Sequence, residues 1–376
     1  MKDKIRSKAG ADDKKTSNKV RIAKFILHKK ETSKQEITAT LGISMPTVLQ
    51  NIKELTQEGL VAEVGEYEST GGRKAKALSI VADVRYAIGI DITANHISYV
   101  LIDLKGNLCT HQRIRRAFVN SLDYYEELTT TLHAFIEETG IDREKLLGVG
   151  VALPGIIDKS LDMLVRSHIL QLSNVSLKSI RQMIPYEVAF ENDANSAALA
   201  ELAGLRQNAV YLSLSNTVGG AIYMHDAIYP GDHFKSGEFG HVMIESKGRR
   251  CYCGKRGCAD AYCAAGVLST HTQGSLEEFF ERLKARDEKL MKVWDEYLEY
   301  LAIVVTNTRM TFDCPIILGG YVGGHMDGYM PDLYRKVLNY NRFESDTEYL
   351  WQCRYQREAS AVGIAMGFVE SYFDHL

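Results

Sequence analysis

The sequence of 376 residues lacks any long apolar run, and this absence bears on where the protein works. No stretch approaches the roughly 18 apolar residues that a transmembrane helix needs. The first residues, MKDKIRSKAGADDKK, also lack the apolar core of a signal peptide. We therefore expect a cytoplasmic protein with no membrane partner.

The sequence also lacks the even set of cysteines that a disulfide framework requires. It has seven cysteines, and three of them fall in a metal-ligand pattern, which fits a reducing compartment. Its hydrophobic content of 45% and charged content of 25% are those of a soluble globular protein. The length exceeds that of one ordinary hydrophobic core, so two or three domains are expected.

The segment Gly237–Cys263 gathers one histidine and four of the seven cysteines. Three of these cysteines are spaced Cys-x-Cys-x4-Cys, and the histidine lies ten positions before the first of them. Zinc takes four tetrahedral ligands of these types, and a closed Cys3His set leaves no open position for catalysis. The pattern predicts a structural zinc site, and the alternative is a group of unrelated buried thiols. The predicted ligands are His241, Cys251, Cys253 and Cys258.

The net charge of −3 conceals an uneven distribution of charge along the chain. Residues 1–80 hold 16 Lys and Arg against 10 Asp and Glu, a net charge of +6, so residues 81–376 carry −9. The basic end suggests a polyanion as partner. For residues 1–16 alone, a solvated and disordered tail is the prediction.

Three helices are predicted after Thr16, and the first has one apolar face. Ser33–Glu36 is a capping box that starts the second helix. Gly42 then makes a short turn, and the third helix begins at Ser44. This is the plan of a helix-turn-helix, in which the second helix of the pair lies in the major groove.

The outward face of the third predicted helix carries side chains that suit base contacts. Gln and Asn can pair with adenine, and Thr or Met can touch a thymine methyl group. Strand, turn and strand then follow Gly59, as in the wing of a winged helix. We expect operator DNA as partner and a homodimer or a dimer of dimers; the alternative is a three-helix protein-interaction module. The predicted DNA-binding residues are Met45, Thr47, Gln50, Asn51, Arg73 and Lys74.

Two strand hairpins in the rest of the chain resemble each other, Ile88–Leu108 and Val210–Tyr229. Each is followed, after an interval, by long amphipathic helices. This repeat predicts two related α/β lobes with a cleft between them, which is a usual place for a small ligand. The predicted domains are residues 1–82, residues 83–195 with 357–376 as the first lobe, and residues 196–356 as the second lobe.

Polar residues are expected to line this cleft where buried strands end. Val149–Asp158 is one such strand, broken by a Pro-Gly pair, and a second is followed by Glu191–Asn195. Polar residues at the carboxyl ends of strands are well placed to bind ligands. Asp193 is the candidate general base, because its carboxylate can take the proton from a substrate hydroxyl. The alternative is that this segment only caps a helix predicted at Ser196–Leu205.

These motifs make the large domain resemble the ROK family of sugar kinases and repressors, and the helix-turn-helix makes the chain resemble its repressor branch. The most specific matches are GVALPG at 150–155, ENDA at 191–194, SGEFGH at 236–241 and CYCGKRGC at 251–258. The resemblance implies a two-lobed, actin-like (ribonuclease H-like) ATPase fold of the α/β class, with a winged helix-turn-helix at the N-terminus. It assigns sugar hydroxyls to Asn192, Asp193, Glu238, His241 and Asp260.

The resemblance also gives His241 two roles, because its two ring nitrogens can serve zinc and sugar separately. At Asp260 the family usually has Glu, and Asp reaches about one methylene less. This difference implies either a sugar that differs from glucose in size or epimer, or a water that fills the gap.

The nucleotide side departs from the kinase pattern. Kinases of the family carry an Asp-x-Gly-Gly-Thr turn whose N–H groups approach the ATP phosphates, whereas this chain reads DITAN at 91–95. Without these glycines, side chains occupy the space that the phosphates need. The second phosphate loop, SNTVGG at 215–220, is altered too, which argues against ATP as a cofactor. The degenerate nucleotide site is predicted at Asp91, Thr93, Gly219, Gly220, Gly319 and Gly320.

The resemblance therefore implies a sugar-responsive transcriptional repressor of carbohydrate metabolism genes without useful kinase activity. A monosaccharide or sugar phosphate in the cleft would release the DNA. One alternative is an active ATP-dependent sugar kinase that also binds DNA, which Asp193 favours. A further alternative is a repressor controlled by a protein partner, with a vestigial sugar pocket.

Overall fold

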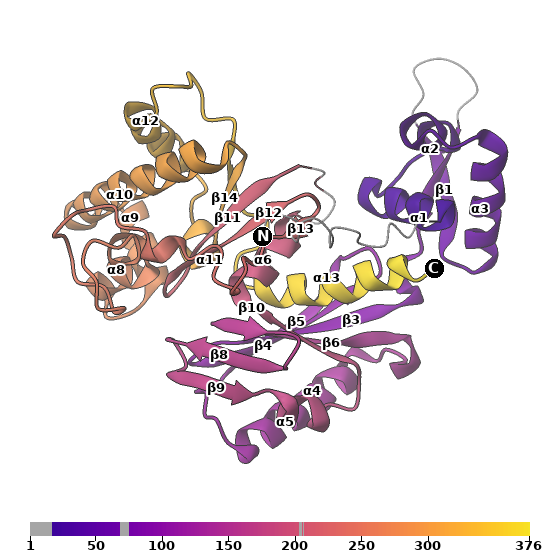
Figure 1. Ribbon diagram of the computed structural model, residues 1–376, viewed down its shortest axis with the longest axis horizontal. Coiled ribbons are helices and arrows are strands. Elements are labelled where there is room, and N and C mark those ends of the chain that lie inside the picture. Colours follow the sequence, from indigo (N-terminus) through magenta and orange to yellow (C-terminus); the bar gives the residue numbers. More distant parts are fainter. Residues whose placement is uncertain (1–16, 68–74, 203–204, 206) are drawn as a thin grey trace, which may run out of the picture. The chain divides into compact units, whose positions relative to one another are not determined.

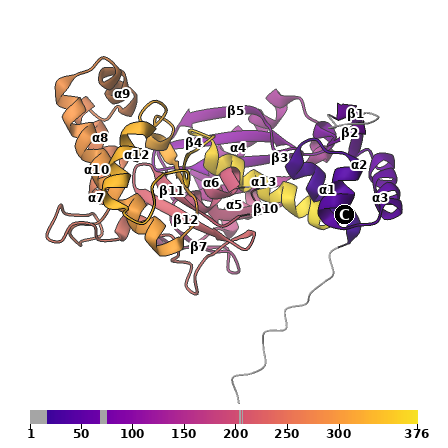
Figure 2. The ribbon, with the colours of Figure 1, turned by 90° about the horizontal axis from the view of Figure 1, so that it is seen from above.

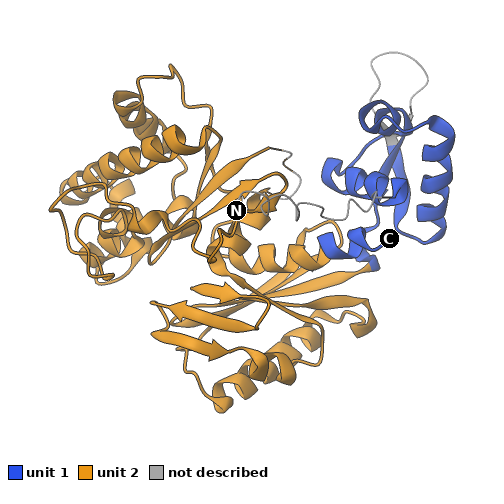
Figure 3. Ribbon diagram, viewed as in Figure 1, with its two compact units in different colours: residues 1–84, 370–376 blue, residues 85–369 orange. Residues whose placement is uncertain are grey.

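The computed structural model describes residues 17–67, 75–202, 205 and 207–376 (Figure 1). The chain forms two compact units (Figure 3). The N-terminal unit comprises residues 1–84 and 370–376, and the large unit comprises residues 85–369. Of residues 357–376, predicted as part of the first lobe, 370–376 group with the N-terminal helices.

The N-terminal unit confirms the predicted order of three helices and two strands. Ser33 starts the second helix by accepting a hydrogen bond from the N–H of Glu36 at 3.2 Å. Gly42 ends that helix with φ +64°, a left-handed conformation that glycine adopts without steric cost. The elements are α1 (Asn18–Lys29), α2 (Lys34–Leu41), α3 (Met45–Gln57), β1 (Val61–Tyr67), β2 (Ala75–Ile80) and the short η1 (Ala82–Val84). β1 and β2 pair antiparallel.

The first lobe of the large unit is built on a five-stranded sheet in the order β10-β6-β3-β4-β5. β3, β4 and β5 are antiparallel neighbours, and β6 and β10 run parallel to β3. A smaller sheet of three strands, β7-β8-β9, extends this lobe. The strands are β3 (Tyr86–Ile92), β4 (His96–Asp103), β5 (Leu108–Arg115), β6 (Leu146–Leu153), β7 (Ile156–Asp158), β8 (Met163–Ser167), β9 (Leu172–Ser176) and β10 (Val188–Asn192).

Helices cover both faces of the first sheet. α4 (Leu122–Thr139) and α5 (Lys178–Met183) share a hydrophobic core with one face. α13 (Ala359–Asp374) lies against the other face, where glycines let it approach closely (Figures 1 and 2). A Cβ atom at Gly89 would lie 1.8 Å from the carbonyl oxygen of Ala361, so only glycine fits there. This packing fixes the start of α13 near the carboxyl ends of β3 and β6.

The second lobe repeats the topology of the first, with the strand order β13-β12-β11-β14-β15. β11 and β12 form the antiparallel hairpin, and β14 and β15 run parallel to β11. The predicted duplication of hairpins is therefore confirmed. The strands are β11 (Ala209–Leu214), β12 (Val218–Met224), β13 (Ala227–Ile228), β14 (Ile316–Gly319) and β15 (Leu350–Gln352).

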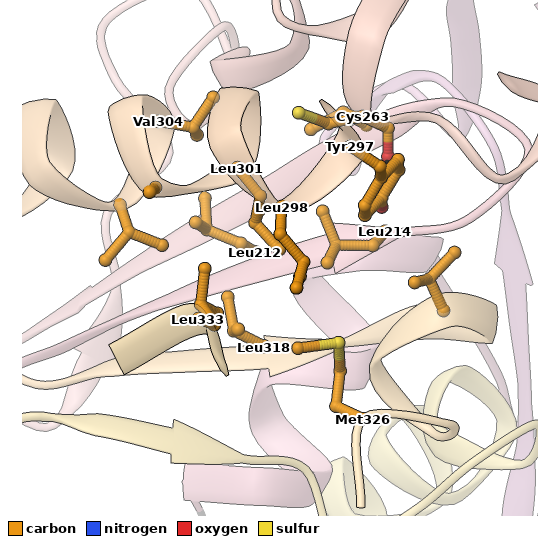
Figure 4. Close-up of a cluster of buried hydrophobic side chains, with 14 of the residues drawn as sticks. Leu212, Leu214, Cys263, Tyr297, Leu298, Leu301, Val304, Leu318, Met326 and Leu333 are labelled. Atoms are coloured by element: carbon orange, nitrogen blue, oxygen red, sulfur yellow. The ribbon is translucent and has the colours of Figure 1, made fainter. Parts of the chain in front are cut away.

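The largest core of the second lobe lies between its sheet and α10 (Glu288–Phe312). Figure 4 shows Leu212 and Leu318 from the sheet packed toward Leu298 and Leu301 of α10. The opposite face of the sheet packs on α6 (Asp193–Leu202). The remaining helices are η2 (Arg143–Lys145), η3 (Phe239–His241), α7 (Asp260–Cys263), α8 (Ala265–Ser269), η4 (Thr270–Thr272), α9 (Leu276–Lys284), α11 (Gly320–Gly323) and α12 (Met330–Tyr340).

Three details bear on the predictions. α6 begins at Asp193, three residues before the predicted start at Ser196, so Asp193 lies in the first helical turn.

In the part of the chain that the structure describes, no helix is both long and apolar enough to cross a membrane. All seven cysteines lie in this part, and none forms a disulfide.

Candidate functional site

A cavity of ≈ 750 Å³ lies in the large unit, between its two lobes. This volume is within the range of about 300–1,000 Å³ that is usual for small-ligand sites. Four of the five predicted sugar residues lie on its wall: Asn192, Asp193, Glu238 and His241. Asp260 is not among the described residues that line it.

Asn192 and Asp193 stand where β10 ends and α6 begins. The side chain of Asn192 donates to the carbonyl oxygen of Gly155 at 2.9 Å and accepts from the N–H of Asn195 at 3.0 Å. One carboxylate oxygen of Asp193 accepts from the N–H of Ala194 at 3.0 Å. These bonds cap the helix, as the alternative interpretation proposed. They also hold both side chains on the cavity wall, so capping and ligand binding are compatible here.

Carboxyl groups crowd around Asp193. Burial raises the pKa of Asp193, and burial together with the nearby Asp193 charge raises the pKa of Glu238. Asp91, only 5% exposed, has its pKa raised to about 7 by burial and by Asp193. Buried like charges disfavour ionisation of both groups. A polar ligand that donates hydrogen bonds would relieve this repulsion, which suits sugar hydroxyls.

The SGEFGH segment is held against β12 by close backbone contact. Gly237 has φ +79°, and a Cβ atom there would lie 2.3 Å from the carbonyl oxygen of Gly220. Glu238 follows directly and precedes η3, which ends at His241. The glycines therefore place Glu238 and His241 on the wall of the cavity.

The four predicted metal ligands meet in one cluster. The ligand atoms of His241, Cys251, Cys253 and Cys258 all lie within 4.8 Å of one another. The sulfur atoms of Cys253 and Cys258 are 3.8 Å apart, and Nδ1 of His241 is 3.9 Å from the sulfur of Cys251. Two thiolates on a tetrahedral zinc at about 2.3 Å are separated by roughly 3.8 Å. The donor set and its spacing therefore fit zinc.

The loop that carries the cysteines depends on a glycine. Gly257 has φ +77°, and a Cβ atom there would lie 1.7 Å from the carbonyl oxygen of Glu245. The N–H of Cys251 donates to the carbonyl oxygen of Lys255 at 2.9 Å. This bond closes a turn that contains Cys253 and precedes Cys258. This folding brings ligands from four positions together without a long connecting segment.

Asp260 has a different environment from the other predicted sugar residues. It is 6% exposed, and its carboxylate accepts a hydrogen bond from the N–H of Val218 at 2.7 Å. Burial raises its pKa to about 6, against the effect of that bond. The shorter side chain thus contacts the backbone at the start of β12.

Sequence reasoning missed several residues of the cavity wall. Tyr252 lies between two predicted metal ligands, and its hydroxyl is 3.3 Å from Nε2 of His241. His168 lines the cavity from the first lobe. The cations Lys159, Arg166 and Lys235 also line it, and Lys159 pairs with the buried Glu191. The only available signal was their position beside recognised motifs.

The predicted nucleotide site of the large unit is nearly filled by protein atoms. A cavity of ≈ 60 Å³ there is lined by Asp91, Thr93 and Gly320, far below the volume of usual ligand sites. The hydroxyl of Thr93 accepts from the N–H groups of Asn95 at 3.4 Å and His96 at 3.0 Å. The N–H groups of this first turn therefore already donate to the side chain of Thr93.

The loop after β14 shows the same pattern. The N–H of Gly320 donates to the hydroxyl of Tyr211 at 3.1 Å, and the N–H of Tyr321 donates to the hydroxyl of Ser215 at 3.4 Å. Gly319 ends β14, and a Cβ atom there would lie 2.1 Å from the hydroxyl oxygen of Tyr211. By contrast, Gly219 and Gly220 line the large cavity. Five of the six predicted nucleotide residues thus divide between the two cavities, and Gly319 lines neither.

In the N-terminal unit, α3 buries Val48, Ile52 and Leu55 on its inward face. Gln50 is exposed and donates to Glu54 at 2.6 Å, while the half-buried Asn51 donates to the carbonyl oxygen of Thr47 at 2.7 Å.

Two further residues of α3 complete this face. Met45 accepts a weak hydrogen bond from Thr38 at 3.9 Å, which draws it toward α2. Leu49, which sequence reasoning missed, is 46% exposed and adds an apolar side chain to the outward face. Arg73 and Lys74 lie outside the described residues.

The sequence matches the model of the ROK family over residues 87–369. The chain belongs to the ROK family. It is 29% identical over 316 residues to the xylose repressor of Bacillus spizizenii, a match that covers 81% of this chain and 82% of that protein.

Two crystal structures share its fold. One is a ROK family transcriptional regulator, homologous to the MLC protein of E. coli (TM-score 0.72, 20% identity, 96% of each chain). The other is a ROK family glucokinase from Streptomyces griseus in complex with glucose and AMPPNP (TM-score 0.60, 21% identity, 75% of this chain and 98% of that chain). The predicted two-lobed fold is confirmed, and the ROK family includes both regulators and sugar kinases.

Proposed function

We propose that this ROK protein is a sugar-responsive transcriptional repressor of carbohydrate metabolism genes. The observation that carries this proposal is the pairing, in one chain, of a helix-turn-helix with a ≈ 750 Å³ cavity lined by Asn192, Asp193, Glu238 and His241. Helix α3 would read an operator, and sugar in the cavity would release it. Because a helix-turn-helix usually works in symmetric pairs, the DNA-binding form is a homodimer or a dimer of dimers on a palindromic site.

The similarity to a xylose repressor makes D-xylose the first effector to test. Asp260, which is shorter than the usual Glu and binds the backbone of Val218 instead of lining the cavity, supports a sugar other than glucose. The cations Lys159, Arg166 and Lys235 on the wall make a sugar phosphate the second class to test, because phosphate pairs with basic side chains.

Zinc would be held by His241, Cys251, Cys253 and Cys258, with no open coordination position. Bound zinc would supply structural support, fixing the loop from 251 to 258 on the wall of the sugar site. Since His241 lies in both the cluster and the cavity wall, the metal would also fix the orientation of its ring.

A route for coupling starts at Asp193. Its backbone carbonyl oxygen accepts a hydrogen bond from the hydroxyl of Ser360 at 3.0 Å, in the first turn of α13. The other end of α13 belongs to the N-terminal unit, where Lys24 of α1 pairs with Glu370 at 3.2 Å and Asp374 at 2.7 Å. A shift of α6 on sugar binding would thus act on α13, and a differential affinity of about 1–3 kcal/mol suffices for regulation.

An active sugar kinase is the second candidate, favoured by the retained Asp193 carboxylate. Against it stand the ≈ 60 Å³ nucleotide cavity and the N–H groups already bonded to Thr93, Tyr211 and Ser215. Phosphoryl transfer depends on positioned phosphates, so a base without this cradle has nothing to act on.

The test uses the full-length protein. Binding sites are first selected from a pool of random double-stranded DNA, and the selected site is then titrated with protein in the presence of D-xylose, D-glucose, xylose 5-phosphate or glucose 6-phosphate. We expect a palindromic site and at least a tenfold loss of DNA affinity with one of these sugars. Selection of no common sequence, or DNA binding that none of the four compounds changes, would contradict the proposal.

A further inference from the structure

Tyr252 lies among the predicted zinc ligands and is the residue there that bears most directly on sugar recognition. It lies between Cys251 and Cys253, lines the cavity and is 51% exposed. Its hydroxyl is 3.3 Å from Nε2 of His241, and the two ring centroids are 5.3 Å apart. The ring nitrogen that faces away from the cysteines is therefore already engaged by a tyrosine hydroxyl.

The two nitrogens of His241 have different neighbours, and this sets the direction of the hydrogen bonds. Nδ1 faces the sulfur of Cys251, on the side of the metal cluster. A histidine that binds a metal through one nitrogen is neutral and carries its proton on the other. With Nδ1 bound to a metal, Nε2–H would donate to the oxygen of Tyr252. The O–H of Tyr252 then remains as a donor for a group in the cavity.

A second aromatic side chain faces Tyr252 from the first lobe. His168 follows β8, and its ring centroid is 5.7 Å from that of Tyr252 with an interplanar angle of 61°. The centroids of His168 and His241 are 6.4 Å apart. Three rings from the two lobes thus meet edge-on at one end of the cavity. A ligand at this end must contact Tyr252 or displace it.

We propose that Tyr252 is a specificity-determining residue of the sugar site, whose hydroxyl donates a hydrogen bond to one hydroxyl of the effector while His168 closes the site from the opposite lobe. This inference rests on the proposed function. The carboxylate of Asp260 is bonded to Val218, and Nε2 of His241 is bonded to Tyr252. The loop from 251 to 258 therefore recognises the sugar through the hydroxyl of Tyr252.

The test is calorimetric titration of the full-length, zinc-containing protein with D-xylose, D-glucose and the monodeoxy analogues of both. Tyr252→Phe should weaken binding of the preferred parent sugar about tenfold, the effect of losing one hydrogen bond with its polar partner left unpaired. One monodeoxy analogue, which lacks the hydroxyl that Tyr252 contacts, should bind the wild type and the variant equally. Zinc content and melting temperature should stay unchanged.

Two further variants sharpen the result. His168→Ala, outside the zinc segment, should also weaken the parent sugar at least threefold. Tyr340→Phe, at the end of α12, removes a hydroxyl that donates to Glu299 of α10 and should change nothing. If the wild type binds a sugar and Tyr252→Phe binds every analogue with wild-type affinity, the role of Tyr252 is refuted while the proposed function stands. If Tyr252→Phe loses zinc, its role is structural and the inference fails. If the wild type binds no sugar, the proposed function and this inference fall together.

Discussion

The hydroxyl of Thr93 accepts a hydrogen bond from the N–H of His96 at 3.0 Å, inside the turn where a kinase of this family would hold phosphate. The turn is therefore satisfied by its own side chain. Its neighbour Asp91 is buried beside Asp193, and the cavity that they share is ≈ 60 Å³. The small volume leaves little room for a nucleotide beside the carboxylate of Asp193, which leads to the first prediction.

Asp193→Asn should weaken sugar binding by roughly tenfold, because a carboxylate accepts stronger hydrogen bonds than a neutral amide. It should also blunt the release of DNA by sugar, whereas the wild type shows no sugar-dependent ATP turnover. Calorimetry, DNA titration and a coupled ADP assay measure the three quantities. Asp123→Asn, an exposed change on α4, is the matched control. Sugar phosphorylation that Asp193→Asn abolishes would instead establish the kinase.

The zinc prediction concerns metal content. We expect about one zinc per chain in freshly purified protein and its loss in Cys258→Ser, since a Cys3His site needs all four ligands. The variant should also melt at a lower temperature, because metal binding contributes to folding. Cys109→Ser, at an exposed cysteine outside the cluster, should keep both properties. Full zinc retention in Cys258→Ser would show that the cluster is not the metal site.

Local sequence patterns predicted part of this site, whereas contacts between residues far apart in the chain could not be predicted. The spacing of the cysteines and the duplicated hairpins are local patterns, and both predicted what the structure shows. The orientation of Asp260 toward Val218 depends on residues 42 positions apart. The contact of Tyr252 with His168 depends on how the two lobes are arranged, and no periodicity in the sequence encodes that arrangement. The earlier start of α6 follows from Asn192, whose side chain caps the helix by accepting the N–H of Asn195.

A prediction on pH follows from Asp91. Its folded pKa of about 7 lies above the ordinary 3.8, so the folded protein keeps a proton that the unfolded chain releases in this range. The free energy of unfolding therefore falls as pH rises from about 4 to about 7, by roughly 4 kcal/mol at most. Asp91→Asn cannot ionise, and its stability relative to wild type should grow between pH 5 and pH 8. Denaturant unfolding at both pH values measures this; a constant difference would show that Asp91 titrates normally.

For DNA recognition, Gln50→Ala should relax base preference at one position of each half-site, because the exposed Gln50 can pair with a base edge. Arg73→Ala should weaken binding to all sequences alike and reduce the salt dependence by about one phosphate contact. Repeating the random-pool selection with each variant separates the two effects. Unchanged specificity after removal of both Gln50 and Asn51 would show that α3 is not the recognition helix.

The last prediction concerns the end of α13. Lys24 of α1 pairs with Glu370 and Asp374, and all three belong to the N-terminal unit. These pairs are partly exposed, so each contributes only about 0.2–1 kcal/mol to stability. If α13 carries the signal from Ser360, Lys24→Met should leave sugar affinity and sugar-free DNA affinity within about twofold of wild type. The sugar-induced loss of DNA affinity should shrink severalfold.

The matched control for this prediction is Lys19→Met, which removes the pair of Lys19 with Glu58, also within the N-terminal unit but away from α13. It should keep the full response to sugar, because α13 is untouched. A normal response in Lys24→Met would show that the signal does not pass through this contact. An equal loss of response in both variants would point to general loosening of the N-terminal unit. Only a selective loss in Lys24→Met supports α13, since coupling requires a contact that differs between the two states.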